Sequence, residues 1–308
     1  MPHTPPSQAA LKKEAIMVSF GSQSMIAPLR SVLLKHPRDA FLSQEHLNAE
    51  WKRFGYLSCP SFDKALEEYG YFESILRQFV DDIFYLPSNE ETGLDSIYTH
   101  DPVQITKNGA ILMNMSKALR RKEPAAIQAY LENLDIPIYG AIAEQGKMEG
   151  GDVLWLDENT VALGRGYRTN DEGIRQFFSL AAFVENHIIF DLPHARGPEE
   201  CLHLMSIVSL IDKDLAVVYS PLMPVRLRQY LLERGYSLIE VPEEEYKTLG
   251  CNVLTLAPRI CVLLKGNATV SSELRRFGAE VYEYPGENIS LCGTGGPTCL
   301  TRPLLRSC

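Results

Sequence analysis

The sequence predicts an α/β protein that is built as a closed ring of repeated units. The same order of elements recurs along most of the chain, namely strand, turn, strand, helix and strand. The third strands end at a spacing of roughly 43 to 54 residues, the range expected for a propeller or another repeated array. These ends lie near Pro87, Ala141, Pro193, Pro242 and Pro285. An open sheet assembled from βαβ units is the alternative fold.

The two ends of the chain complete this pattern. The first unit lacks its opening strand, and residues 300–304 near the C-terminus can supply that strand and close the ring. No segment has the composition of a linker, so residues 26–308 are predicted to form a single domain. Residues 1–25 are predicted to be a short flexible lead, without the charged and apolar regions of a signal peptide.

Composition and charge narrow the class of protein. The 308 residues are 45% hydrophobic and 22% charged, as in an ordinary globular protein. A net charge of -9 argues against nucleic acid or an anionic membrane as a partner. No apolar run is long enough to span a bilayer. The composition therefore predicts an ordinary globular protein, and a homo-oligomer is left open.

The cysteines point to a reducing compartment. All seven are scattered, with no Cys-x-x-Cys pair, which argues against a disulfide framework and a structural zinc site. We therefore expect a cytoplasmic protein with no metal and no cofactor. Cys201, Cys251 and Cys261 lie in or beside apolar strands and are predicted to be small buried hydrophobes, while Cys308 is predicted to be a mobile terminal thiol.

The elements of the first half are predicted from short apolar runs that end at turn residues. Asn170 or Asp171 can cap the last of its helices, and Lys107-Asn108-Gly109 has good turn chemistry. The predicted strands cover residues 26–36, 83–86, 96–105, 110–115, 137–141, 151–156, 160–164 and 187–192. Helical segments are predicted around residues 48–51 and over 62–79, 124–134 and 170–184.

The second half repeats the same order of elements. Two of its helices end at a glycine, Gly235 and Gly278, which is the residue most often found just beyond a helix. The predicted helices cover residues 225–234 and 271–277. The predicted strands cover residues 202–211, 215–219, 237–241, 252–257, 260–264, 280–284 and 300–304.

A loop of glycines near the C-terminus leads into a single cysteine. The stretch Gly293-Thr294-Gly295-Gly296-Pro297-Thr298-Cys299 can bring its backbone close to a ligand, because glycine accepts conformations that other residues resist. A thiolate is an effective nucleophile, so the loop is a candidate to present one. No Gly-Lys-Ser/Thr follows, which excludes a Walker A loop. The alternative is a turn followed by an ordinary buried cysteine, and Cys292 is the nearest rival thiol.

Three polar stretches occupy corresponding points of the repeat, at or near the starts of first strands. They contain Asp95 and Asp101, Glu149 and Asp152, and His203. Each has an ordinary alternative explanation, since the acids suit a solvated turn and a lone histidine among apolar residues is usually a core residue. Their shared position favours one composite site, because the repeated ends point toward a common axis where Cys299 could meet them.

With these residues the sequence resembles the guanidine-modifying enzymes of the pentein superfamily, which includes arginine deiminase, dimethylarginine dimethylaminohydrolase and the amidinotransferases. The resemblance covers about residues 29–304, and it implies a ring of five ββαβ units around a pseudo-fivefold axis. Its marks, in order, are Thr-x-Asp101-Pro, Glu149-Gly-Gly-Asp152, His203-Leu and Gly-Gly-x-x-Cys299.

Finer features look most like the dimethylarginine hydrolases, notably Asp95-Ser96, Arg120-Arg121 and the stretch over residues 149–170. Met205 stands where deiminases and amidinotransferases carry the second acid of a His-x-Asp motif, whereas the loop over residues 295–299 looks more like the deiminases. The expected function is hydrolysis of a methylated arginine or arginine to citrulline. Amidino transfer and non-catalytic amino-acid binding are the alternatives.

The resemblance also implies roles for individual residues. Cys299 would attack the guanidinium carbon and form a thiouronium intermediate, His203 would act as general acid and then as general base, and Glu149 would orient the imidazole. Arg120 and Arg168 suit a substrate carboxylate, with surface charge as the alternative. The implied substrate-binding residues are Asp95, Asp101, Arg120, Asp152, Arg168 and Asn252.

Overall fold

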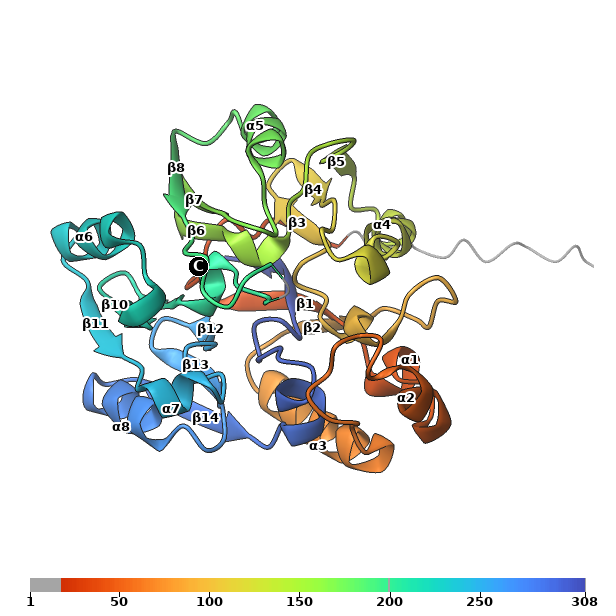
Figure 1. Ribbon diagram of the computed structural model, residues 1–308. Helices are drawn as coiled ribbons and strands as arrows, with labels where there is room; N and C mark the ends of the chain where they lie inside the picture. Colours follow the sequence, from red (N-terminus) through yellow and green to blue (C-terminus); the bar gives the residue numbers. More distant parts are fainter. Residues whose placement is uncertain (1–17, 199, 308) are drawn as a thin grey trace, which may run out of the picture.

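The computed structural model describes residues 18–198 and 200–307, and within them the strands form five three-stranded sheets arranged in a ring (Figure 1). In every sheet the middle strand pairs antiparallel with one neighbour and parallel with the other. This is the ββαβ arrangement expected from the repeat. The predicted pentein ring is therefore confirmed, and the open sheet is wrong.

The strands are short, and most lie within one or two residues of the predicted bounds. The first sheet contains β15 (Arg302–Arg306), β1 (Leu29–Leu34) and β2 (Asp82–Tyr85). The second contains β3 (Val103–Thr106), β4 (Gly109–Leu112) and β5 (Ile138–Ala141). The third contains β6 (Val153–Asp157), β7 (Thr160–Arg165) and β8 (Asn186–Asp191). The fourth contains β9 (Val208–Asp212), β10 (Leu215–Val218) and β11 (Ser237–Glu240), and the fifth contains β12 (Leu254–Ala257), β13 (Ile260–Leu264) and β14 (Glu280–Tyr284).

The helices lie around the outside of the ring (Figure 1). Asn170 caps α5 as predicted, because its Oδ1 accepts a hydrogen bond from Gly173 N at 2.9 Å. Gly235 and Gly278 follow two of the helices with φ of +82° and +80°, which confirms them as stops. The helices are α1 (Pro37–Ala40), α2 (Gln44–Glu50), α3 (Phe62–Leu76), α4 (Glu123–Asn133), α5 (Asp171–Leu180), α6 (Val225–Glu233), α7 (Glu243–Tyr246) and α8 (Ala268–Arg276). The short helices α1 and α7 were not expected, and no described helix is long and apolar enough to cross a membrane.

The C-terminal strand closes the ring as expected. β15 pairs antiparallel with β1, with Leu33 opposite Arg302 and Leu29 opposite Arg306. Of the lead predicted over residues 1–25, residues 1–17 lie outside the described residues. Gly21, in the remainder, donates to Leu304 O at 2.8 Å and accepts from Arg306 N at 2.9 Å, so contact with the ring begins before residue 26.

The apolar core lies between neighbouring units, so each unit depends on the next. In one cluster, for example, Leu154 and Phe190 of the third sheet pack with Val208 of the fourth sheet and Leu227 of α6. The other clusters of the described residues likewise join adjacent units, including the last and the first. A single unit could not bury its apolar faces alone, which is the usual reason that repeat proteins need their neighbours.

Three predicted strands begin later than expected, because their first residues form 3-10 turns. These turns are η1 (Leu94–Ile97), η3 (Gly150–Asp152) and η4 (Leu204–Ser206). In η3 and η4 polar side chains bond to backbone, since Asp152 Oδ1 accepts from Leu204 N at 2.9 Å and Ser206 Oγ accepts from His203 N at 3.1 Å. Such bonds give the backbone an alternative to a sheet ladder. The strands therefore begin only at Val103, Val153 and Val208.

We predict that the buried guanidinium of Arg302 is important for stability. Its Nη1 donates to Gln104 Oε1 at 2.9 Å and its Nη2 donates to His100 O at 2.7 Å, both deep in the ring. Arg302→Ala leaves both oxygens without this donor, and each such loss costs about 1–3 kcal/mol. Urea unfolding should show a loss of about 3 kcal/mol or more.

The matched control is Arg175→Ala, because that side chain is 67% exposed and its salt bridge to Glu172 lies on the surface. A surface pair of this kind contributes about 0–1 kcal/mol. An equal loss of stability in the two variants would contradict the role given to Arg302.

Candidate active site

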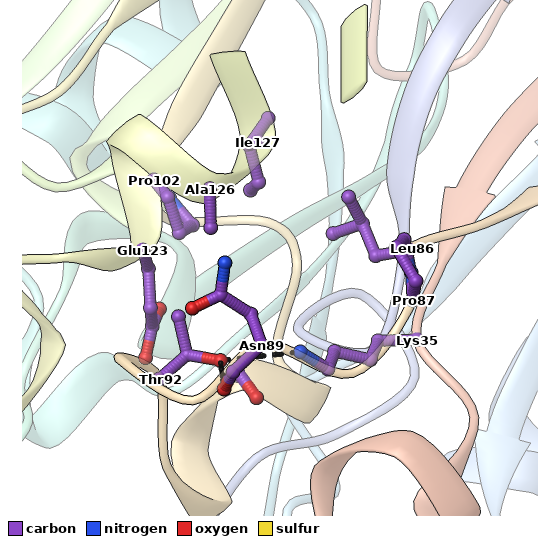
Figure 2. A pocket seen from close by; sticks show the side chains of 10 residues that line it. Lys35, Leu86, Pro87, Asn89, Thr92, Pro102, Glu123, Ala126 and Ile127 are labelled. Atoms are coloured by element: carbon purple, nitrogen blue, oxygen red, sulfur yellow. Dashed lines mark hydrogen bonds between the residues drawn. The ribbon is translucent and has the colours of Figure 1, made fainter. Parts of the chain in front are cut away.

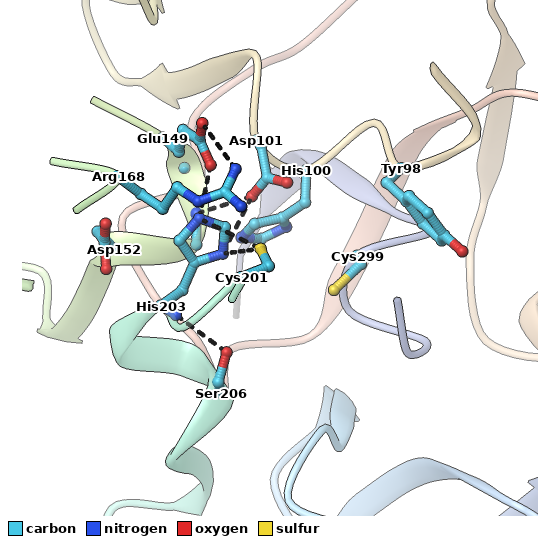
Figure 3. A network of polar contacts seen from close by, with 12 residues as sticks. Tyr98, His100, Asp101, Glu149, Asp152, Arg168, Cys201, His203, Ser206 and Cys299 are labelled. Carbon is cyan, nitrogen blue, oxygen red and sulfur yellow. Dashed lines mark hydrogen bonds and ion pairs between the residues drawn. The ribbon is translucent and has the colours of Figure 1, made fainter. Parts of the chain in front are cut away.

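The turns at the starts of three neighbouring units bring the predicted catalytic residues together. Glu149 precedes η3, His203 precedes η4, and Asp101 lies just before β3. Cys299 comes from the loop before β15, which the closed ring places beside the same turns. Figure 3 shows the three polar side chains as one group, with the Cys299 thiol on the side away from Glu149.

Glu149 and His203 form a buried pair. Glu149 is fully buried, and its Oε2 lies 2.8 Å from His203 Nε2. The other oxygen accepts from Ser116 N at 2.9 Å and from Lys117 N at 3.3 Å. Burial alone would raise the pKa of Glu149, but the hydrogen bond and charge of His203 lower it below its usual value. The carboxylate is thus positioned to hold one imidazole orientation, as predicted.

The surroundings of His203 favour its charged form. Burial works to lower the pKa of His203, but the adjacent Cys201 and the charges of Asp101 and Asp152 outweigh it and raise the pKa well above 6.5. Its Nδ1 lies 3.9 Å from Asp101 Oδ1. A proton is therefore available on this ring at neutral pH for transfer to a leaving group.

Asp101 is a permanently charged carboxylate at the centre of the group. Its Oδ2 accepts from Arg120 Nη1 at 2.6 Å, and its Oδ1 accepts from Gly151 N at 3.0 Å. Burial would raise the pKa of Asp101, but His203 and Arg120 hold it far below the usual range. Such a carboxylate attracts a cationic substrate.

Arg120 is placed differently from the predicted role. Its Nε donates to both oxygens of Glu123 at 3.1 and 3.0 Å, and its Nη2 donates to Tyr98 O at 2.8 Å. With Nη1 held by Asp101, the guanidinium is engaged on all sides by the protein. Arg120 is therefore a positioning residue for Asp101 rather than a free fork for a substrate carboxylate.

The guanidinium of Arg168 is only loosely held, and its predicted role in binding a substrate carboxylate stays a prediction. Its Nη1 lies 3.7 Å from Glu149 Oε1, and its Nε is buried without a hydrogen-bond partner among the described residues. Figure 3 shows the guanidinium above the ring of His203, directed at the polar group. A bidentate carboxylate could satisfy these free donors.

Asp152 and Asp95 lie in supporting positions. Asp152 is fully buried, and besides Leu204 N it accepts from Thr169 Oγ1 at 2.6 Å. Both its oxygens serve the neighbouring turns, so the structure does not favour the predicted contact with substrate. Burial also raises its pKa to about 6. Asp95 is buried and forms an ion pair with Lys117 Nζ at 2.6 Å.

Asn252 holds the cysteine loop in place. Its Nδ2 donates to Cys299 Sγ at 3.2 Å, and its Oδ1 accepts from Thr298 N at 3.0 Å. The loop passes so close that a Cβ at Gly296 would overlap the side chain of Asn252. A Cβ at Gly295 would overlap the ring of Tyr98. Gly295 and Gly296 are thus required by close packing, whereas the positive φ of this loop, +62°, lies at Thr294.

The resting thiol of Cys299 is protonated. Burial and the charge of Asp101 raise its pKa to about 11, and the hydrogen bond from Asn252 and the charge of His203 only partly oppose them. At neutral pH a free Cys299 therefore carries its proton. Bringing a cation beside Asp101 would lower this pKa and release the thiolate.

Cys201 was predicted to be buried, and this prediction is wrong. The residue is exposed, in the segment before η4, and its Sγ lies 3.7 and 3.9 Å from Nδ1 and Nε2 of His203. The strand that was predicted from this apolar run begins only at Val208. Cys251 and Cys261 are buried as predicted, and Cys308 lies outside the described residues.

Several partners in the site carried no recognisable signal in the sequence. Glu123 and the backbone N–H groups of Ser116 and Lys117 are examples, because their role depends on which side chains lie nearby. One group in the described part of the chain could hold a metal ion, since ligand atoms of Glu149, Cys201 and His203 lie within 4.8 Å of one another. Sulfur, imidazole and carboxylate are ligands that suit zinc.

Known proteins were compared with the chain by sequence. The family model described as "N,N dimethylarginine dimethylhydrolase, eukaryotic" matches residues 52–306. An uncharacterised protein of Bacillus subtilis, YkgA, is 31% identical over 212 residues, which are 69% of this chain and 70% of that protein. An arginine deiminase of Listeria welshimeri is 25% identical over 252 residues, and the match covers 68% of this chain but only 61% of the deiminase.

Solved structures show the same fold at lower sequence identity. A dimethylarginine dimethylaminohydrolase mutant from Pseudomonas aeruginosa, in complex with citrulline, superimposes with a TM-score of 0.72 and 21% identity, covering 89% of this chain and 99% of that one. The amidinotransferase SxtG of Microseira wollei gives a TM-score of 0.76 with 14% identity over 94% of this chain and 98% of that one. The sequence match over most of its length shows that the chain belongs to the N,N dimethylarginine dimethylhydrolase family, within the pentein superfamily.

Proposed function

We propose that this protein hydrolyses a methylated arginine or arginine through Cys299, giving citrulline and an amine or ammonia. Membership of the family makes it a hydrolase of guanidino compounds. The observation that carries the finer proposal is the charge around the thiol. Asp101 is an ionised carboxylate that raises the pKa of Cys299, so the site is suited to a substrate that brings its own positive charge.

Substrate binding uses charges at both ends of the molecule. The guanidinium lies against Asp101, whose orientation is maintained by Arg120 and Gly151 N. The α-carboxylate binds Arg168, whose Nε has no partner among the described residues. Two charges of opposite sign thereby select a substrate that carries a cation at one end and a carboxylate at the other.

The chemistry then follows from Cys299 and His203. The substrate cation lowers the thiol pKa, the thiol proton passes to solvent, and Sγ attacks the guanidinium carbon to form a C–S bond. The imidazolium of His203 protonates the departing nitrogen, and the C–N bond breaks to leave a thiouronium on Cys299. Neutral His203, still held by Glu149, next removes a proton from water that attacks the same carbon. Cleavage of the C–S bond releases the ureido product and restores the thiol.

Met205 favours a methylated substrate and hydrolysis over transfer. It is buried in the apolar cluster that also contains Leu204 and Val208, so no second acid grips the guanidinium from this position. A missing carboxylate leaves room for a methylated nitrogen. Amidino transfer to an acceptor amine is the alternative reaction, and it would yield a new guanidino product instead of citrulline.

The first prediction is that the protein releases citrulline from at least one of dimethylarginine, monomethylarginine and arginine. Each compound is incubated with the protein and citrulline is quantified, once without and once with an added acceptor amine such as glycine or ornithine. Absence of citrulline from all three compounds contradicts the proposed hydrolysis. A guanidino product that forms only with the acceptor identifies a transferase.

The second prediction concerns the nucleophile. Cys299→Ser should lower kcat by at least about a thousandfold, because a serine hydroxyl is far less acidic and no base is arranged to activate it. Its melting temperature should stay close to that of the unmodified protein, since only one sulfur changes. Cys292→Ser is the matched control, as Cys292 lies before the same glycines but its Sγ is 3.1 Å from Ser58 Oγ. If Cys292→Ser lost turnover while Cys299→Ser kept it, the nucleophile would be Cys292 rather than Cys299.

The third prediction separates substrate binding from thiol ionisation. Asp101→Asn removes one partner of a buried charge pair, a change that commonly costs about 2–5 kcal/mol, so kcat/KM should fall sharply. The same variant removes a negative charge that raises the pKa of Cys299. In the absence of substrate, iodoacetamide should therefore alkylate Cys299 faster than in the unmodified protein between about pH 7 and 9.

Asp191→Asn is the control for Asp101→Asn, because Asp191 is exposed at the end of β8, where it pairs with Arg165. Asp191→Asn should change neither kcat/KM nor the rate at which iodoacetamide alkylates Cys299. Alkylation that is slower in Asp101→Asn than in the unmodified protein would show that Asp101 does not set the ionisation of the thiol.

A further inference from the structure

A second cavity lies next to the active site, and none of the catalytic residues lines it. About 350 Å³ of empty space, part of it open to solvent, separates the ends of β1 and β2 from the start of α4 (Figure 2). The segment that contains Asn89 and Thr92 forms one side of it. The cavity therefore lies between the first and second units, beside η1.

Two of the polar groups that line this cavity are buried and incompletely bonded. Lys35 is only 2% exposed, and its Nζ donates to Thr92 Oγ1 alone at 3.3 Å, so two of the three ammonium hydrogens lack a partner among the described residues. Ser96 is 7% exposed, and its Oγ is buried with no hydrogen-bond partner among those residues. Buried polar groups of native proteins are normally bonded, so a missing partner of opposite character is indicated.

The opposite wall offers a negative charge and an apolar surface. Glu123 is 2% exposed, and Figure 2 shows its carboxylate across Thr92 from the amine of Lys35. Burial raises the pKa of Glu123 to about 7 even though Arg120 works to lower it. Leu86 and Ile127 add apolar surface to the same cavity.

We propose that this cavity is a second binding site, specific for a small zwitterion such as an α-amino acid with a short aliphatic side chain. The carboxylate of the ligand accepts hydrogen bonds from Lys35 and Ser96. Its ammonium group donates to Glu123, which has free lone pairs besides those used by Arg120. Its side chain packs on Leu86 and Ile127. Each group that lines the cavity thereby receives a partner of matching chemistry.

The site is connected to the catalytic group through a chain of ion pairs. Glu123 binds Arg120 at 2.9 Å, and Arg120 binds Asp101 at 2.6 Å. A ligand ammonium that shares Glu123 weakens its hold on Arg120, which then binds Asp101 more strongly. The carboxylate of Asp101 becomes less available to the substrate guanidinium. Occupation of the cavity should therefore raise KM, and couplings of this kind typically change an affinity about fivefold or more.

The test measures binding of L-valine by calorimetry to the full-length protein, so that its result does not depend on turnover. Lys35→Met and Ser96→Ala are the site variants, and each should weaken binding about tenfold or more. Lys122→Met is the matched control, because this lysine adjoins α4 but is 64% exposed and does not line the cavity. It should bind valine like the unmodified protein.

Acetate and methylamine, each with one of the two charges, should bind more weakly than valine. With an active substrate, valine should raise KM of the unmodified protein and of Lys122→Met, but not of Lys35→Met. Binding that is unchanged in both site variants would place valine in the active site and overturn the proposal. The absence of binding at millimolar valine would also overturn the proposal. Acetate that binds as tightly as valine would overturn it too. If Lys35→Met does not fold, Ser96→Ala and Thr92→Val decide the outcome.

Discussion

Hydrogen bonds between turns of neighbouring units are the contacts on which the site depends. Asp101 accepts from Gly151 N, and Asp152 in turn accepts from Leu204 N in the next unit. Asn252 holds Thr298 N, and His100 N donates to Cys299 O at 3.2 Å. Each unit thus positions the turn of its neighbour, and the pairing of β15 with β1 completes the ring of contacts. Without the ring, Asp101, Glu149, His203 and Cys299 would belong to segments separated by 48, 54 and 96 residues, with no local reason to meet.

These contacts also hold the resting thiol of Cys299 in its protonated form. Asp101 keeps its charge because Arg120 and His203 stabilise it, and that charge opposes ionisation of Cys299. A protonated thiol is a poor nucleophile and resists oxidation. A guanidinium substrate reverses this balance by adding a positive charge at the same place. In the proposed mechanism, one carboxylate therefore both selects the substrate and couples its arrival to activation of the nucleophile.

The buried charges extend beyond the catalytic group. Arg120 connects Asp101 to Glu123, and Glu123 lines the neighbouring cavity with Lys35. In a low-dielectric interior such charges influence one another along a chain of ion pairs, because little solvent screens them. The ion pairs therefore place the second cavity in electrostatic contact with the active site, although no residue of the catalytic group lines it.

The sequence by itself determined the repeat and the helix ends, and it pointed to the residues that the closed ring brings together. Periodicity and turn residues are local properties, so Asn170, Gly235 and the strand ends could be recognised from their neighbours along the chain. Only the tertiary structure decided how Arg120, Asp152 and Cys201 are used. Folding brings Arg120 to Asp101 and Glu123. It brings Asp152 to Leu204 N and Thr169, and it brings Cys201 to the ring of His203. A charged or polar side chain binds whatever the closed ring places beside it, and no local pattern records that choice.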